Sequence, residues 1–276
     1  MCIMLNLKDS IKKVYRKFQS GWRKVKLLWS INWTKTLYFN FKMLPIYAAI
    51  KLPVYFWGPV KFTSLTGKII INGPIKRNLV SFGLNLELVR SRIGTAEIII
   101  EGTLLINGEF VTGNDYKIVV LKNATLEICE GSYLGSRTII VASKKIILGK
   151  WFRLGYDSQI LDSNFHFILN LEDNKVLQSN GEIIIGDYCW VGNRSSIMKG
   201  TKTPKNLIIG SNSLLNKDYT SIIPENSIIG GTPAKLIQIN RARLFDPKVE
   251  VEIYQYFMEN PEAEYFELQN PQIKTI

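Results

Sequence analysis

The stretch "IGDYCWVGNRSSIMKGTKTPKNLIIGSNSLL", residues 185–215, repeats an aliphatic residue at intervals of six. Five of its six counted positions are aliphatic, and Thr203 is the exception. Six residues are the length of one short strand plus one turn, and a fixed short period is typical of coils that stack on one another. The counted positions are Ile185, Val191, Ile197, Thr203, Ile209 and Leu215.

The same count extends beyond this stretch in both directions, with interruptions. Towards the N-terminus it runs from Ile128 to Ile146, slips by two and resumes at Leu148; towards the C-terminus it slips by two and resumes at Ile223. Three strands per turn predict a triangular prism with one aliphatic side chain per hexad inside, and slips are expected where a corner carries extra residues. A β-sandwich would instead show longer strands that alternate with period two. The remaining counted positions are Leu134, Ile140, Leu154, Ile160 and Ile229.

Segments of different composition flank the repeat region. Residues 1–66 are basic and aromatic, with apolar residues at helix-like spacing, residues 67–238 carry the coil, and residues 239–276 follow it. Residues 167–181 turn polar after the first few and leave the hexad, so we expect a loop that leaves the coil there. The predicted fold has an all-β core, with a basic helical or extended segment before it and a helix after it.

The segment "FDPKVEVEIYQYFMEN", residues 245–260, indicates that C-terminal helix. Asp246 suits an N-cap, and Pro247 suits the first helical position because its missing N–H would have no intrahelical partner. We expect this helix to pack along the prism or across an oligomer.

The charge balance limits the partners. The chain has 35 Lys and Arg against 23 Asp and Glu, a net charge of +12. A basic surface favours phosphate-rich ligands, anionic glycans, an anionic membrane or nucleic acid, although it also serves plain solubility. No helix-turn-helix, zinc-finger or RNA-recognition motif is found in the sequence, which disfavours nucleic acid.

The sequence also bears on compartment. The N-terminus lacks a signal peptide with a cleavage site, and residues 41–60, although apolar, contain two lysines and three prolines, which disfavours a spanning helix. Basic amphipathic residues with Trp favour either peripheral contact with an anionic membrane or docking on the prism. Cys2, Cys129 and Cys189 are odd in number and lack metal-like spacing, so we expect a cytoplasmic protein without disulfides or a metal.

Two motifs carry a resemblance to a known family. The segment "GEIIIGDYCWVGNRSSIMKG", residues 181–200, and "GTPAK", residues 231–235, resemble the hexapeptide-repeat acyltransferases, above all the galactoside, maltose, serine and surface-polysaccharide O-acetyltransferases. The resemblance implies a left-handed parallel β-helix and a homotrimer with active sites between subunits. It also implies transfer of an acetyl group from acetyl-CoA to a hydroxyl, or in some branches to an amine, without a metal or covalent intermediate.

His166 is the one histidine of the chain, and taken alone it would be read as a core residue. The resemblance implies instead that it is the catalytic base, because the family histidine often closes an Asp-x-Asp-x-His motif and an imidazole can deprotonate an attacking hydroxyl. Asp162 would orient the imidazole, bind the acceptor, or simply hold a β-turn. Asn164 replaces the second Asp, so a charged partner for His166 at that position is in doubt.

The resemblance also implies a set of donor-binding residues. Trp190 corresponds to a Trp near the pantetheine arm and thioester, or else is an interface aromatic. Asn193 and Ser211 lie at turns whose backbone contacts pantetheine amides in relatives. Lys217 and Lys235 lie near the CoA phosphates, or else are solvated lysines.

One segment departs from the family pattern. "GTKTPKN", residues 200–206, lacks the aliphatic-Gly pair, so we expect local distortion there. The function expected is an acetyl-CoA-dependent O-acetyltransferase acting on a bacterial surface polysaccharide or its sugar precursor. The alternatives are an N-acetyltransferase acting on a nucleotide-linked amino sugar, and a catalytically silent trimeric scaffold.

Overall fold

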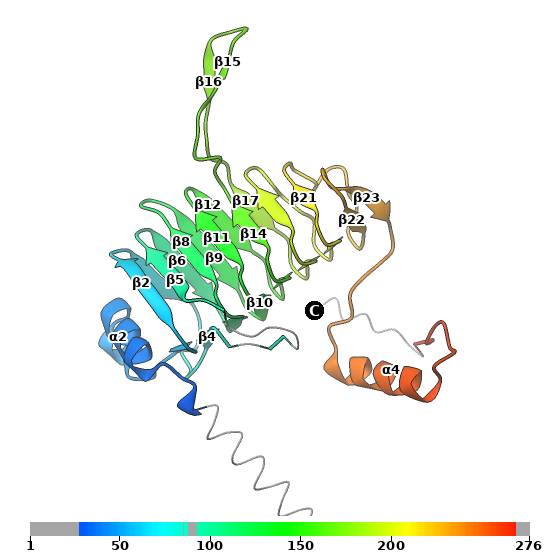
Figure 1. The fold of residues 1–276 in the computed structure, drawn as a ribbon, viewed down its shortest axis with the longest axis horizontal. Coiled ribbons are helices and arrows are strands. Elements are labelled where there is room, and N and C mark those ends of the chain that lie inside the picture. Colours follow the sequence, from blue (N-terminus) through cyan, green and yellow to red (C-terminus); the bar gives the residue numbers. More distant parts are fainter. Residues whose placement is uncertain (1–27, 85, 88–92, 269–276) are drawn as a thin grey trace, which may run out of the picture.

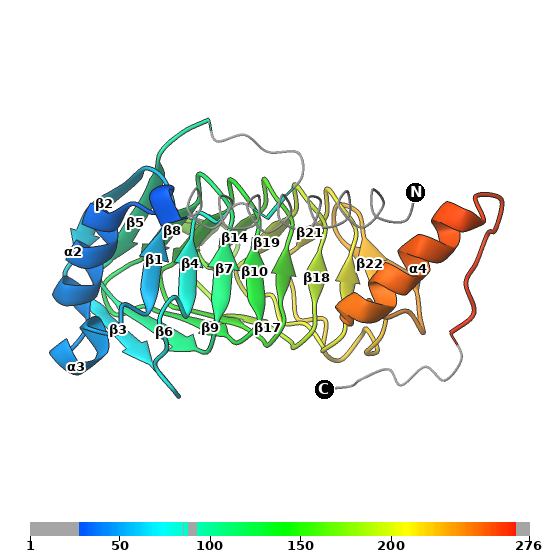
Figure 2. The same cartoon turned by 90° about the horizontal axis from the view of Figure 1, so that it is seen from below.

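A computed structural model describes residues 28–84, 86–87 and 93–268. Cys2 and the expected basic helix of residues 1–27 lie outside the described residues. The described chain winds into a three-sided prism whose coils advance from the blue to the yellow end (Figure 1). In Figure 2 the chain climbs each strand of the nearest face while the coils advance from left to right. This winding is left-handed, the uncommon hand for parallel crossovers.

Each coil contributes strands to parallel sheets that form the faces of the prism. The chain visits them in the order face A, face B and face C. Face A consists of β1 (Val54–Phe56), β4 (Val80–Phe82), β7 (Phe110–Thr112), β10 (Ser132–Leu134), β13 (Arg153–Leu154), β18 (Trp190–Val191), β20 (Ile208–Ile209), β22 (Ile228–Gly230) and the antiparallel β23 (Lys235–Gln238). Face B consists of β2 (Val60–Leu65), β5 (Ala96–Ile100), β8 (Lys117–Val120), β11 (Ile139–Ala142), β14 (Gln159–Leu161), β19 (Ser196–Met198) and β21 (Leu214–Leu215). Face C consists of β3 (Lys68–Ile71), β6 (Thr103–Asn107), β9 (Thr125–Cys129), β12 (Lys145–Leu148) and β17 (Ile183–Ile185).

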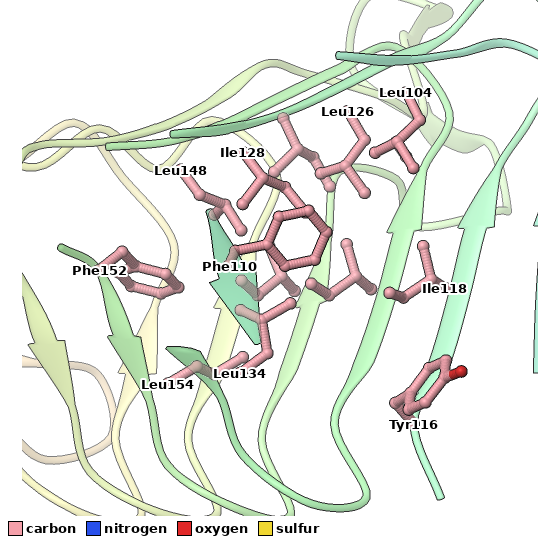
Figure 3. Packing of buried hydrophobic residues seen from close by; sticks show 14 of the residues in the cluster. Leu104, Phe110, Tyr116, Ile118, Leu126, Ile128, Leu134, Leu148, Phe152 and Leu154 are labelled. Atoms are coloured by element: carbon pink, nitrogen blue, oxygen red, sulfur yellow. The ribbon is translucent and has the colours of Figure 1, made fainter. Parts of the chain in front are cut away.

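The hexad residues form the core of the prism. Every counted position is buried, and Figure 3 shows side chains of successive coils stacked inside the shaft. Register keeps them aligned, because Ile160 pairs with the hexad residues Ile140 and Ile197 of the neighbouring coils. The expected cause of the first slip is wrong: Ile146 and Leu148 both point inward from one strand, β12, so no longer corner is involved.

Helix α2 (Trp33–Met43) closes the N-terminal end of the prism (Figure 2). Its side chains form hydrogen bonds with backbone N–H and carbonyl groups of β1, the first strand of face A. Asn40 Nδ2 donates to the Val54 carbonyl at 2.7 Å, Asn40 Oδ1 accepts from the Val54 N–H, and Thr36 Oγ1 accepts from the Phe56 N–H. An uncovered edge strand would be open to pairing with another chain, so these polar helix residues protect the first coil.

The prism begins earlier than the expected boundary between residues 66 and 67. Strands β1 and β2 already belong to faces A and B, directly after α2 and the short α3 (Ile46–Ala49). The sequence of residues 54–65 shows no hexad count, which is why its strands were missed. Among the described residues, no helix is both long and apolar enough to cross a lipid bilayer.

The coil is irregular at residues 200–206, as the missing aliphatic-Gly pair predicts. Face C stops as a sheet at β17, and isolated bridges through Lys202 continue it. Thr203 takes the inward position, where its Oγ1 accepts a hydrogen bond from the Gly186 N–H at 3.0 Å. A hydroxyl therefore stands where the repeat normally places an aliphatic side chain.

The segment expected to be a polar loop is an antiparallel hairpin. Strands β15 (Ile168–Asn170) and β16 (Lys175–Leu177) pair with each other, and Ser163 bridges to Asn180 at the base. The hairpin rises from the edge between faces B and C and stands clear of the prism (Figure 1). Its exposed apolar residues are Phe167, Ile168, Leu169, Leu171, Val176 and Leu177.

Helix α4 (Pro247–Glu259) follows the last strand, β23, and confirms the predicted cap. The Asp246 carboxylate accepts a hydrogen bond from the Lys248 N–H at 2.9 Å, and Pro247 opens the helix. No residue of α4 is buried, and an extended segment holds the helix apart from the prism (Figure 1).

Candidate active site

His166 lies at the base of the hairpin, on the edge between faces B and C. Its side chain is exposed, as are its neighbours Phe165 and Phe167, so it is not a core histidine. No hydrogen bond joins it to another described residue. Phe165 has φ 59°, a left-handed conformation that costs a bulky residue roughly 1–2 kcal/mol. Such strain persists where the surrounding structure enforces it, and it often accompanies functional sites.

Asp162 is buried beneath this turn, and its carboxylate faces the corner of the preceding coil. Oδ1 accepts hydrogen bonds from the N–H and Oγ of Ser143 at 2.6 and 2.7 Å. Oδ2 accepts from the N–H groups of Lys144 and Lys145 at 2.8 and 2.9 Å. A carboxylate offers about four acceptor sites, so these bonds occupy it fully. In the described chain these bonds tie Asp162 to the preceding corner, and no hydrogen bond joins its carboxylate to His166.

Asn164 joins the two sides of the hairpin base through its backbone. Its N–H donates to the Ser179 carbonyl at 2.8 Å, and its side chain is half-exposed. The three residues expected to be catalytic thus share one turn, but no hydrogen bond connects their side chains in the described chain.

Trp190 lies on the outer surface of face A, in β18, with 41% of its surface exposed. The guanidinium carbon of Arg243 lies 5.0 Å from its ring centroid. Figure 1 shows that the hairpin and face A are on opposite sides of the prism. A single chain therefore does not bring Trp190 to His166.

The two turn residues expected to contact the donor do meet. Asn193 and Ser211 lie at the edge between faces A and B in successive coils, and Ser211 Oγ donates to Asn193 Oδ1 at 2.6 Å. The two lysines stand apart from them. Lys217 is exposed after β21, with Nζ 5.5 Å from the Tyr219 ring centroid, and Lys235 is exposed on β23.

Several residues around Trp190 were missed by the sequence analysis. Face A carries a groove of about 620 Å³ that contains Trp190, Trp151, Arg153 and Arg243. The sequence signal for Trp151 and Arg153 was the Trp-Phe-Arg segment after "LGK". Arg243 gave no signal, because it reaches the groove from beyond the repeat.

Comparison with known proteins finds relatives by sequence, although no family model matches the chain. The polysialic acid O-acetyltransferase of Neisseria meningitidis is 30% identical over 142 residues, 51% of this chain and 65% of that protein. The enzyme of the same name from Escherichia coli O1:K1 is 30% identical over 114 residues, 39% of this chain and 36% of that protein. A chloramphenicol acetyltransferase of Morganella morganii is 43% identical over 61 residues, 22% of this chain and 27% of that protein.

Among solved structures, the polySia-specific acetyltransferase NeuO aligns with a TM-score of 0.49 at 20% identity, covering 74% of this chain and 98% of that chain. The chain spans less than two thirds of the length of the curated relatives it matches. The relatives named above are all acetyltransferases. By sequence the chain is similar to acetyltransferases, and its motifs resemble those of the hexapeptide-repeat acyltransferases.

Proposed function

We propose that the protein is an acetyl-CoA-dependent O-acetyltransferase that modifies a hydroxyl of a bacterial surface polysaccharide or its sugar precursor. The observation that carries the proposal is its 30% identity to two polysialic acid O-acetyltransferases from different bacteria. The exposed His166, held on a strained turn, supplies the group that such a reaction needs.

In this mechanism His166 acts as general base. Its neutral imidazole takes the proton of the acceptor hydroxyl while the oxygen attacks the thioester carbonyl of acetyl-CoA. The tetrahedral intermediate then collapses, the C–S bond breaks, and the imidazolium returns the proton to the leaving thiolate. The acetyl group passes directly to the acceptor, so no covalent enzyme intermediate and no metal is invoked.

The donor is proposed to lie along the surface marked by Trp190, Asn193 and Ser211. The exposed indole fits contact with the pantetheine arm, and the corner at Asn193 and Ser211 offers polar groups at the surface. Lys217 and Lys235 are exposed cations suited to the CoA phosphates, since a lysine binds phosphate as a point charge.

We further propose that the active unit is a homotrimer with its sites between chains. His166 and Trp190 occupy opposite sides of one prism, so a site containing both needs a second copy. The hairpin beside His166 presents apolar side chains to solvent, which is typical of an arm that contacts another subunit.

A cytoplasmic location with peripheral contact to the inner membrane face is also proposed. Between Asp9 and Glu87 the sequence has fourteen Lys and Arg residues and no acidic residue. Helices α2 and α3 expose Trp33, Tyr38, Phe41, Ile46 and Tyr47 in this basic region. Aromatic and apolar side chains next to cations fit the interface of an anionic bilayer.

Sedimentation with lipid vesicles tests this contact. The full chain is expected to bind phosphatidylserine-containing vesicles and to be released by 0.5 M salt, roughly, because surface attraction is screened. A Tyr38→Ser, Phe41→Ser variant should bind more weakly, whereas Tyr265→Ser, an exposed aromatic near the other end, should not. Equal binding to neutral and anionic vesicles would contradict the proposal.

The test of the transferase is release of CoA from acetyl-CoA in the presence of polysialic acid, O-antigen oligosaccharides and nucleotide-linked amino sugars. His166→Ala is expected to lower acceptor-dependent turnover by about 10²–10⁴-fold, the usual contribution of a general base. Lys175→Ala, on the exposed hairpin, is the matched control and should keep most activity.

The other outcomes separate the alternatives. Turnover on an amine acceptor that persists in His166→Ala would indicate the N-acetyltransferase, since a neutral amine needs no base to attack. Absence of both CoA binding and turnover in the wild type would indicate the silent scaffold.

A further inference from the structure

A column of corner residues with unusual backbone conformations runs along one edge of face A, and two of its members, Gly131 and Trp151, line the groove. The register of face A aligns these residues at the turn that enters successive strands, and all have positive φ. Glycine or asparagine fills this position in three of these coils, as expected for left-handed backbone. Trp151 and Tyr188 fill it in the two central coils despite the steric cost. The column consists of Gly131, Trp151, Tyr188, Asn206 and Asn226.

The C-terminal segment covers these two aromatic corners. The ring of Phe245 packs edge-on against Tyr188, with centroids 5.6 Å apart, and against Trp151 at 6.4 Å. Two residues earlier, the guanidinium carbon of Arg243 lies 5.0 Å from the ring centroids of both Trp190 and Phe245. The segment thus places a cation inside an aromatic wall.

A second cation stands beside the first. Arg153, in β13, pairs in register with Trp190, and its guanidinium carbon is 5.8 Å from the Phe245 ring centroid. Its Nη1 donates to the carbonyls of Gly131 and Phe152. Burial, and next the charge of Arg243, lower the pKa of Arg153 to about 10, so it stays protonated at neutral pH.

No ion pair offsets the charges of Arg153 and Arg243 within the described chain. Glu87 and Glu109 also line the groove, but Glu87 accepts from the Ser136 N–H at 3.2 Å. Only Glu250 raises the pKa of both guanidinium groups, and it forms no ion pair with either.

Two half-buried like charges that share no ion pair repel each other, and an anion bound between them would relieve that repulsion. We propose that Arg153 and Arg243 form an anion subsite in the face A groove, which binds a phosphate or carboxylate group of a substrate against the Trp151 and Trp190 rings. This inference rests on the proposed function and adds the class of ligand that the site selects. The anionic group comes either from the donor, as a CoA phosphate, or from an acidic sugar of the acceptor.

Calorimetric titration of the full chain distinguishes these sources. The probes are acetyl-CoA, a sialic acid tetramer and the same tetramer with its carboxylates reduced to alcohols. Arg243→Gln is expected to raise the dissociation constant for one of the anionic probes by about tenfold or more, because a charge-assisted hydrogen bond is lost. Arg243→Lys should recover part of that loss by keeping the charge.

Arg241→Gln is the matched control. Arg241 lies on the same segment, is exposed, and donates to the Asn240 carbonyl, so its loss removes the same charge without touching the groove. Loss of acetyl-CoA affinity in Arg243→Gln alone assigns the subsite to the donor phosphates. Loss of affinity for the acidic tetramer, with the reduced tetramer unchanged, assigns it to the acceptor.

The subsite is refuted if Arg243→Gln binds both anionic probes within twofold of the wild type, or if Arg241→Gln loses as much. Normal binding of acetyl-CoA by the wild type in that case leaves the proposed transferase standing. A wild-type chain that binds neither acetyl-CoA nor the acidic tetramer overturns the subsite and the proposed function together.

Discussion

The Asp162 carboxylate is held by hydrogen bonds to the preceding coil and not by His166, four residues later. Its carboxylate receives four hydrogen bonds from the corner of the coil before it, so it couples two successive coils at the point where the hairpin leaves the prism. The motif of an acidic residue before His166 therefore has a structural explanation in this chain.

Asp162→Asn should consequently be a stability variant. The amide replaces one acceptor by a donor that faces backbone N–H groups, so at least one pair of bonds is lost. Hydrogen bonds to charged groups each contribute about 1.5–3 kcal/mol, and we expect the free energy of unfolding to fall by about 3 kcal/mol in urea titrations. Asp173→Asn, on the exposed hairpin, should change it little. Normal stability with abolished turnover would return Asp162 to the chemistry.

Cys189 links stability to alkaline pH. The thiol is fully buried, and burial raises its pKa from 9.0 to about 11. Because the pKa is higher in the folded state, its stabilising contribution is complete below pH 9 and is lost as pH rises towards 11. The difference corresponds to ~3 kcal/mol.

Thermal unfolding of the wild type and of Cys189→Ala at pH 8 and pH 10.5 checks this contribution. The wild type should lose more stability than the variant over that interval, since the tyrosines and lysines titrate alike in both. An unchanged gap between the two midpoints would show that folding does not raise the pKa of this thiol.

At the scale of elements, the hairpin joins the prism at its base, where Ser163 bridges to Asn180, and otherwise stands in solvent. All side chains of residues 165–178 are exposed. Replacing residues 168–177 by an Asn-Gly turn should therefore move the thermal midpoint by no more than about 2 °C. Turnover should fall strongly, because the arm next to His166 is gone. A large loss of stability would mean that the hairpin is packed in the assembled protein, which light scattering on the same sample would reveal.

The sequence predicts the elements that depend on local spacing and misses those that depend on distant contacts. The hexad positions are buried as counted, because one inward side chain per strand is a local geometric rule. The hairpin was missed since its apolar residues, such as Leu169 and Leu171, match neither a hexad nor a core. Thr36 and Asn40 of α2 look like ordinary helix residues until β1 supplies the backbone groups they bind.

The candidate site was predicted in part for the same reason. Asn193 and Ser211 meet because the repeat places them one coil apart, which the sequence can foresee. Arg243 and Trp190 meet only because the chain turns back after β23 and crosses face A. The hexad pattern does not predict the path of the chain after β23. The contact between Arg243 and Trp190 therefore could not be predicted from the sequence.

At the scale of the whole molecule, the separation of His166 from Trp190 can be tested by mixing chains. His166→Ala and Trp190→Ala should each be nearly inactive alone. Co-expressed, they should recover activity, because in the proposed trimer a mixed assembly would contain sites with one intact histidine and one intact tryptophan from different chains. Light scattering should give three times the mass of one chain. Absence of recovery in a confirmed mixed trimer would place both residues in the same chain's site or remove one from catalysis.

The stacking of coils has a consequence for how such a protein can change. Neighbouring strands lie about 4.8 Å apart, so the outward side chains on face A repeat at steps of about that size along the prism axis. Adding or removing a whole coil lengthens or shortens the groove without altering its cross-section. The length of an extended substrate that such a groove can contact therefore changes by whole coils. Evolution can adjust that length by duplicating a coil, without altering the rest of the fold.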